Sequence, residues 1–213
     1  MTEPARPALA VCVFCASASG ISGAHLDLAA EVGTELARRG HVLISGGGLA
    51  AAMGAVARAA RDGGARTVGV IPQALAGAEI ADSESDELLV TADMCTRKAE
   101  MMRRADAYLT LPGGLGTLDE LLEVWTTRAL GLHGKPVVVL DPDGIFAPFR
   151  EFTGQLCAQG FVRPGALDVV TWVTSAAAAL DAIEQQAVPA QASPRRVQDG
   201  SREPRMDSTI STA

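Results

Sequence analysis

The sequence predicts an α/β fold in which a doubly wound parallel sheet carries helices on both faces, formed as a single domain. Short apolar runs alternate with helical stretches along most of the chain, and continuous apolar runs are typical of strands buried on both sides. Glycine-rich turns follow several of these runs. With 213 residues, of which 48% are hydrophobic, the chain is long enough to bury one substantial core.

The predicted strands are short runs rich in Val, Ile and Leu that end at glycine, proline or polar residues. Pro72 ends the third run, because proline cannot donate to the ladder of a central strand. The strands are residues 9–14, 41–44, 67–71, 88–91, 107–111, 136–140 and 168–173. In parallel sheets ligands bind at the carboxyl ends of the strands, and the glycine-rich turns are predicted to gather there.

The predicted helices repeat apolar residues every three to four positions, and Gly40 stops the first of them. They are residues 24–39, 49–61, 96–105, 118–130, 146–159 and 176–186. Residues 73–87 are predicted to form an irregular acidic loop. Residues 1–186 thus form the predicted domain. Pro, Gln, Ser, Arg and Asp replace the apolar pattern in residues 187–213, which predicts a disordered tail.

The net charge of −7 argues against a general nucleic-acid or membrane-surface binder. No apolar run approaches the roughly 18 residues of a membrane span, and the first residues lack the pattern of a signal peptide. We therefore expect a cytoplasmic protein with neither a membrane nor a nucleic-acid partner.

Two of the four cysteines form a C-x-x-C pair, Cys12 and Cys15. Cys12 lies inside a predicted strand, whereas a redox pair normally opens a helix. No second pair completes a zinc site, and the three histidines have no ligand spacing. Burial as small side chains is the favoured interpretation, so neither a metal nor a cofactor is predicted.

The most informative stretch is Pro-Gly-Gly-Leu-Gly-Thr-Leu-Asp-Glu at residues 112–120. A strand precedes it and a helix follows it, so free backbone N–H groups and the positive end of a helix dipole point at one spot. Such a spot binds anions, phosphate above all. Two weaker turns, with Ser17 after the first strand and Gly46 and Gly47 after the second, could approach the same ligand or only reverse the chain.

Glu120 has two interpretations. Its spacing from Thr117 matches a capping box, in which the two residues satisfy the first N–H groups of a helix. A catalytic carboxylate would need a partner, and Arg97-Lys98 supplies one near the start of the preceding helix. Two adjacent cations often form only a solvated surface, so both interpretations remain open on the residues alone.

Together these residues resemble the Lonely Guy (LOG) family of cytokinin riboside 5′-monophosphate phosphoribohydrolases. Members carry Pro-Gly-Gly-x-Gly-Thr-x-x-Glu, matched at residues 112–120, and an upstream Arg-Lys pair. Residues 69–79 look like the Val-Ile-Pro-x-x-Leu stretch with its substrate-binding glutamate. The match runs from about residue 9 to 183. Where members carry Gly-Leu-Met-Gly after the triple glycine, this chain has Ala51-Ala52-Met53-Gly54.

The resemblance implies a Rossmann-like sheet, a homodimer and a nucleoside 5′-monophosphate substrate with an adenine-like base. It implies catalytic roles for Arg97 and Glu120. The implied substrate-binding residues are Ser17, Gly46, Gly47, Glu79, Lys98, Gly113, Gly114, Gly116, Thr117 and Thr126.

Two other functions compete. A nucleotide or molybdenum-cofactor carrier of this fold would bind its ligand without hydrolysis, although the retained Arg97 and Glu120 argue against it. Lysine decarboxylation, a label often attached to the family, needs a Schiff-base lysine. Only Lys98 and Lys135 are available, and Lys135 is predicted at the wrong end of the sheet.

Overall fold

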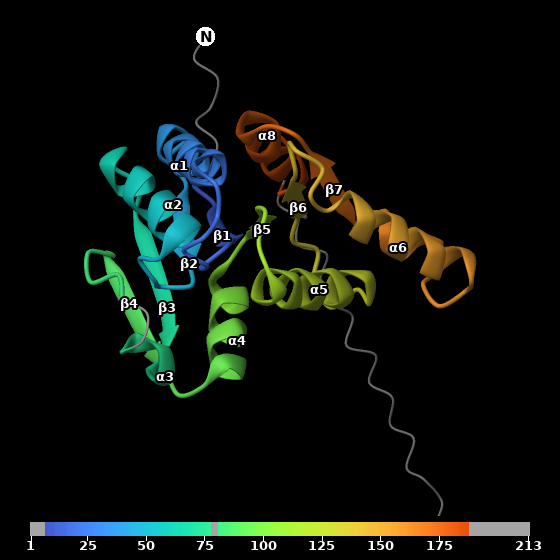
Figure 1. Ribbon diagram of the computed structural model, residues 1–213, viewed down its shortest axis with the longest axis horizontal. Helices are drawn as coiled ribbons and strands as arrows, with labels where there is room; N and C mark the ends of the chain where they lie inside the picture. The colour runs from blue at the N-terminus through green and yellow to red at the C-terminus, as the bar shows by residue number, and fades with distance from the viewer. Residues whose placement is uncertain (1–6, 78–80, 188–213) are drawn as a thin grey trace, which may run out of the picture.

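The structure is a computed structural model that describes residues 7–77 and 81–187. In this part of the chain seven strands form one parallel sheet in the order β4-β3-β2-β1-β5-β6-β7, which confirms the predicted fold class (Figure 1). The strands are β1 (Ala10–Phe14), β2 (Val42–Ser45), β3 (Thr67–Pro72), β4 (Glu87–Thr91), β5 (Ala107–Thr110), β6 (Val137–Leu140) and β7 (Val170–Val173).

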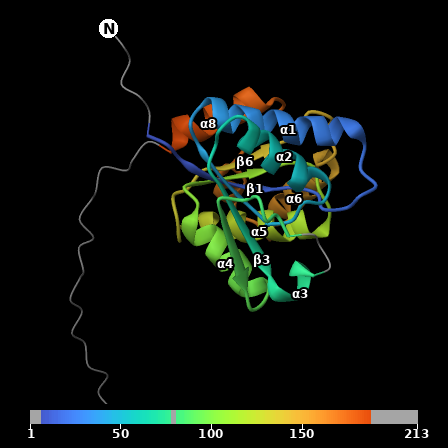
Figure 2. The ribbon, with the colours of Figure 1, turned by 90° about the vertical axis from the view of Figure 1, so that its left-hand side faces the viewer.

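Helices cover both faces of this sheet. The helices are α1 (Gly23–Arg38), α2 (Ala51–Asp62), α3 (Gln73–Ala76), α4 (Met94–Arg104), α5 (Leu115–Ala129), α6 (Ala147–Ala158), α7 (Pro164–Leu167) and α8 (Ala176–Gln186). Figure 2 shows α1, α2 and α8 on one side of the strands and α4 and α5 on the other. Each face therefore has its own hydrophobic core, and β1 contributes side chains to both.

The strand order reverses direction at β1. The chain runs from β1 out to β4 on one side, returns to pair β5 with β1, and continues outward to β7. Phe14 at the end of β1 lies opposite Thr110 at the end of β5. The loops that leave these two strands consequently start side by side and diverge to opposite faces.

Two short helices lie where the sequence predicts none. The predicted loop 73–87 begins with α3, and α7 precedes β7, so the predicted strand 168–173 starts only at Val170. Each has four residues and shows no apolar periodicity from which a helix is predicted. Other boundaries agree to within about two or three residues. Within the described residues, no helix has the length and apolar character needed to cross a membrane.

Candidate active site

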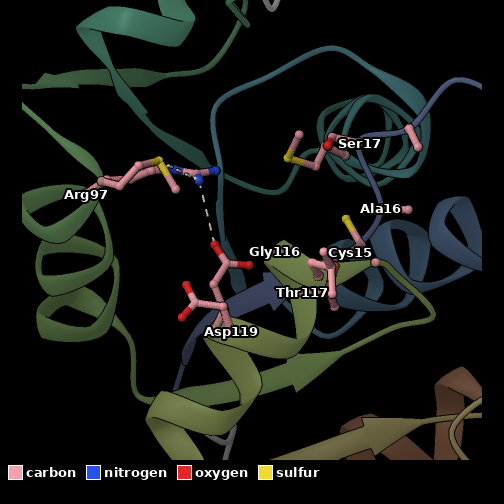
Figure 3. A pocket seen from close by; sticks show the side chains of 13 residues that line it. Cys15, Ala16, Ser17, Arg97, Gly116, Thr117 and Asp119 are labelled. Carbon is pink, nitrogen blue, oxygen red and sulfur yellow. Dashed lines mark hydrogen bonds and ion pairs between the residues drawn. The ribbon is translucent and has the colours of Figure 1, made fainter.

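A cavity of about 260 Å³ opens at the carboxyl edge of the sheet, beyond the ends of β1 and β5 (Figure 3). Residues 15–18, which follow β1, form one wall, and the first turns of α4 and α5 form others. This is the point where the strand order reverses, at which open α/β sheets bind ligands. The turns after β1 and β5 therefore meet at one site, as predicted.

Helix α5 presents an anion-binding end to this cavity. Its N-cap residue is Gly114, and the N–H group of Leu118 donates to the Gly114 carbonyl oxygen at 3.0 Å. The N–H groups of residues 115–117 precede this bond and have no partner inside the helix. All three residues line the cavity. Their donors and the helix dipole favour a negatively charged group, phosphate above all.

The predicted capping box between Thr117 and Glu120 is wrong. The N-cap is Gly114, three residues before Thr117, and no side chain caps this helix. Thr117 instead packs on the preceding turn, where a Cβ on Gly113 would lie 2.1 Å from Thr117 Oγ1. The turn therefore requires glycine at position 113. The carboxylate of Glu120 lies among the cavity-lining groups.

Arg97 is fixed in the cavity wall by backbone carbonyl groups. It lies in the first turn of α4, whose N-cap Asp93 accepts a hydrogen bond from the N–H of Thr96 at 2.7 Å. Its Nε donates to the Val70 oxygen at 3.0 Å and its Nη2 to the Gly46 oxygen at 3.1 Å. The side chain of Arg97 is only 8% exposed. Two carbonyl groups thus hold a buried cation in one orientation.

The remaining guanidinium nitrogen of Arg97 faces Glu120. Arg97 Nη1 lies 3.8 Å from Glu120 Oε1, the ion pair marked by a dashed line in Figure 3. Burial raises the pKa of Glu120 to about 7, and the charge of Arg97 opposes that rise. A carboxyl group with a pKa near 7 exchanges a proton readily at neutral pH. The pair joins a proton acceptor to a fixed cation inside the cavity.

Gly46 and Gly47, which follow β2, do not line the cavity. A Cβ on Gly46 would lie 2.0 Å from Arg97 Nη2, so the close approach that requires glycine is to Arg97. Gly47 has a φ of +73°, and its carbonyl oxygen accepts the N–H of Asp82 at 2.9 Å. Their predicted contact with substrate stays a prediction.

The structure brings together Ser17, Gly114, Gly116 and Thr117 with the two predicted catalytic residues, since all of them line the cavity. Lys98 lies outside the lining and contacts two carboxylates of α5, Asp119 at 2.8 Å and Glu123 at 2.7 Å.

Two further predicted site residues lie elsewhere. Thr126 lines a separate apolar cavity of about 320 Å³ between α5, α6 and α7, together with Trp125 and Leu130. Glu79 lies outside the described residues. The substrate-binding roles of Lys98, Thr126 and Glu79 stay predictions.

Sequence reasoning missed seven lining residues: Cys15, Ala16, Ala18, Met53, Met94, Leu115 and Asp119. Four of them lie within the first turns of helices or directly after a strand, so the rule that ligands bind at this edge of a parallel sheet is the signal that points to them. Met94 also places its sulfur 3.8 Å from Arg97 Nη1.

The structure also describes the residues considered for redox, metal-binding and decarboxylase functions. Cys12 and Cys15 are buried, free thiols whose pKa is raised by burial. Within residues 7–77 and 81–187, no three His, Cys, Asp or Glu side chains are grouped to hold a metal ion. Lys135 precedes β6 at the opposite edge of the sheet, and its Nζ donates to the Met102 oxygen at 2.7 Å.

Comparison with known proteins identifies the family. A family model described as "Possible lysine decarboxylase" matches residues 53–183. A cytokinin riboside 5′-monophosphate phosphoribohydrolase of Mycobacterium tuberculosis is 49% identical over 172 residues, which are 81% of this chain and 91% of that protein. The rice enzyme LOG (Oryza sativa subsp. japonica), which is named for the same activity, is 44% identical over 75% of this chain and 66% of its own length.

Solved structures share the fold at lower identity. The molybdenum cofactor binding protein of Rippkaea orientalis superposes with a TM-score of 0.66 at 20% identity, over 84% of this chain and 97% of that chain. This likeness shows the architecture alone. The family match and the sequence relatives are stronger, and the chain therefore belongs to the Lonely Guy family of cytokinin riboside 5′-monophosphate phosphoribohydrolases.

Proposed function

We propose that this protein hydrolyses the N-glycosidic bond of cytokinin riboside 5′-monophosphates or AMP-like nucleoside monophosphates, releasing the free base and ribose 5-phosphate. The observation that carries the proposal is the pair of Arg97 and Glu120, 3.8 Å apart, beside a cavity wall made of free helix N–H groups. The curated relatives bear the name of this activity.

The phosphate group is held at the start of α5. The N–H groups of residues 115–117 and the Thr117 hydroxyl bind its oxygens, and the dipole of α5 favours its charge. Binding energy from this remote group positions the sugar, so the unphosphorylated nucleoside is a poor substrate.

Glu120 and Arg97 act at the sugar. As the bond between C1′ and the base nitrogen breaks, positive charge develops on the ribose, and the Glu120 carboxylate stabilises it. A water oxygen bonds to C1′ and gives one proton to Glu120. The base leaves with the electron pair of the broken bond and takes up one proton from solvent, and Glu120 then releases to solvent the proton that it took from the water. Arg97 holds the carboxylate in place.

The test is an assay of free base released from a panel of nucleoside 5′-monophosphates, each paired with its nucleoside. We expect Glu120→Gln to lower turnover by roughly 10²- to 10⁴-fold. Glu31→Gln, at an exposed glutamate of α1 outside the cavity lining, is the matched control and should keep turnover within about threefold, as surface changes do.

Full turnover of the Glu120→Gln variant would remove this residue from the chemistry. Tight nucleotide binding without released base from any monophosphate would instead favour a carrier. The decarboxylase label has no suitable lysine at the cavity: Lys98 contacts two carboxylates, and Lys135 lies at the other edge of the sheet.

We also propose that the protein is a homodimer that uses the face around the second cavity. Large apolar side chains are exposed there, Leu122, Leu130 and Phe161 among them, the last two more than half exposed. Exposed apolar patches of this kind are typical of interaction sites. Sedimentation should give a dimer mass that Leu130→Glu converts to a monomer, whereas Val90→Glu, an exposed apolar residue on β4, should leave the dimer intact.

A cytoplasmic location is proposed on the state of the cysteines. All four lie in the described residues as free thiols, which is usual in reducing compartments. Fractionation of the source cells with an antibody to this chain would test it.

A further inference from the structure

The guanidinium group of Arg97 is in tight contact with the turn after β2, residues 46–48. Arg97 Nη2 donates to the Gly46 oxygen at 3.1 Å, and a single added carbon on Gly46 would meet that nitrogen at 2.0 Å. The guanidinium group therefore lies directly on the backbone of the turn. A displacement of Gly46 towards α4 would press on Arg97, and a displacement away from α4 would lengthen the hydrogen bond.

Residues 81–82, in the segment that leads into β4, hold the turn after β2. The carbonyl oxygen of Gly47 accepts the N–H of Asp82 at 2.9 Å, and Gly48 pairs with Ala81 in an antiparallel bridge. On the other side, the backbone of Val70 lies 3.0 Å from the position of a Cβ on Gly47. The turn is thus fixed between β3 and residues 81–82.

Asp82 is fixed by an ion pair. The residue is completely buried, and its Oδ2 lies 2.6 Å from Arg61 Nη1. The Ser85 hydroxyl donates to Oδ2 at 3.1 Å and the Glu84 N–H to Oδ1 at 3.3 Å. A buried carboxylate is costly unless it is paired in this way. Arg61 belongs to α2, the helix that follows the turn.

We propose that the ion pair of Arg61 and Asp82 is a positioning device for the catalytic arginine. It fixes Asp82, whose N–H holds the turn, and the turn sets where the Arg97 guanidinium meets Glu120. Neither residue lines the cavity, so both act through Arg97. The proposal rests on the proposed hydrolysis, in which Arg97 and Glu120 form the catalytic pair.

The phosphate-binding donors give this role a distinct signature. They belong to α5, which follows β5, whereas Arg61 and Asp82 act on the turn after β2. Loss of the ion pair should therefore lower kcat for AMP by about 5- to 30-fold, a range typical of coupling through intermediate residues, and leave KM nearly unchanged. Because Arg97 lowers the pKa of Glu120, the acid limb of the kcat profile should also move to higher pH.

The experiment measures kcat, KM and the pH profile for AMP in Asp82→Asn, Arg61→Met, their double variant and Arg61→Lys. If the two residues act as one pair, the double variant loses no more than either single variant, as in a coupled double-mutant cycle. Arg61→Lys keeps the charge and should recover most of the turnover. Arg61→Met keeps the experiment informative should Asp82→Asn fold poorly.

Arg66→Met is the matched control. Arg66, directly before β3, lies 3.1 Å from Glu87, the first residue of β4, and its side chain is 62% exposed. The Arg66→Met variant should keep the kcat and the pH profile of the natural chain.

A lower melting temperature of Asp82→Asn and Arg61→Met with unchanged kcat and pH profile would overturn the proposal and leave a structural role only. An active Glu120→Gln variant in the same assay would instead mark failure of the proposed hydrolysis.

Discussion

The sequence indicates Gly46 and Arg97 separately as site residues. In the structure the two residues are in contact, and this contact explains why position 46 requires glycine. A glycine after a strand predicts either a tight turn or the close approach of a ligand. Here the group that approaches is the Arg97 guanidinium, 51 positions along the chain. Local spacing carries no information about such a contact. The types of the site residues are therefore predictable from motifs, whereas the reason for each type depends on pairings between distant segments.

The raised pKa of Glu120 predicts how stability depends on pH. Burial, with smaller contributions from Asp119 and Glu123, raises the pKa from 4.5 to about 7, and Arg97 and Lys98 oppose the rise. Between these values the folded state binds the proton more tightly than the unfolded state does, so the free energy of unfolding falls as pH rises from about 4.5 to 7.

Glu120→Gln removes this titration. Above pH 7 the variant should be more stable than the natural chain by on the order of 3 kcal/mol, and the difference should vanish near pH 4.5. Urea unfolding of both proteins across this range measures it. A difference that does not vary with pH would show that Glu120 titrates alike in the folded and unfolded chains.

Ala51 is the one described residue other than glycine with a positive φ, +47°. This left-handed conformation costs an alanine about 1–2 kcal/mol, and glycine avoids that cost but loses more chain entropy on folding. Ala51→Gly should therefore raise the free energy of unfolding by about 0.5–1 kcal/mol. Ala59→Gly, inside the same helix, should lower it by about 1 kcal/mol; the same sign for both in chemical denaturation would contradict the strain at Ala51.

At the scale of whole elements, the sequence predicts helix interiors better than helix starts. The pattern Thr-x-x-Glu predicts that α5 begins at Thr117, yet the N-cap is Gly114, in an extended conformation with φ −90° and ψ −152°. A capping box is a local signal, whereas the start of α5 follows from the turn after β5 and the packing of Thr117 on Gly113. The difference matters because it removes the capping interpretation of Glu120, one of the two that the residues alone leave open.

The pair of α1 and α2 gives a prediction at this scale. A Cβ on Gly33 would lie 2.4 Å from the Val56 oxygen and 2.8 Å from the Ala60 nitrogen, both backbone atoms that cannot move without separating the helices. Gly33→Ala should therefore destabilise the protein by about 1–3 kcal/mol. Gly154→Ala, inside α6 with no atom within 4 Å of the new carbon, should stabilise it by about 0.5–1 kcal/mol. Thermal melting of the two variants should show shifts of opposite sign, and equal shifts would show that α1 and α2 adjust freely.

For the molecule as a whole, alternating apolar runs predict a parallel sheet but not its strand order. Nothing in the sequence of residues 107–111 indicates that this strand, β5, pairs with β1 rather than with β4, the strand that precedes it in the chain. That pairing creates the reversal point and hence the cavity. The turns after β1 and β5 can be predicted to share an edge of the sheet, but their direct apposition depends on a contact between residues almost a hundred positions apart.

The extent of the folding unit is testable at this largest scale. The described members of one hydrophobic cluster end at Ile183 and those of the other at Trp172, and α8 ends at Gln186. We expect a chain that ends at Ala187 to keep the melting temperature and the turnover of the full chain. A chain that ends at Ser175 is the control: it lacks α8, whose Leu180 and Ile183 are completely buried, and loss of even one such side chain costs about 2–5 kcal/mol. A lower melting temperature of the chain ending at Ala187, measured at equal concentration, would show that residues 188–213 contribute to the folded domain. A lower turnover at an unchanged melting temperature would assign them to the site instead.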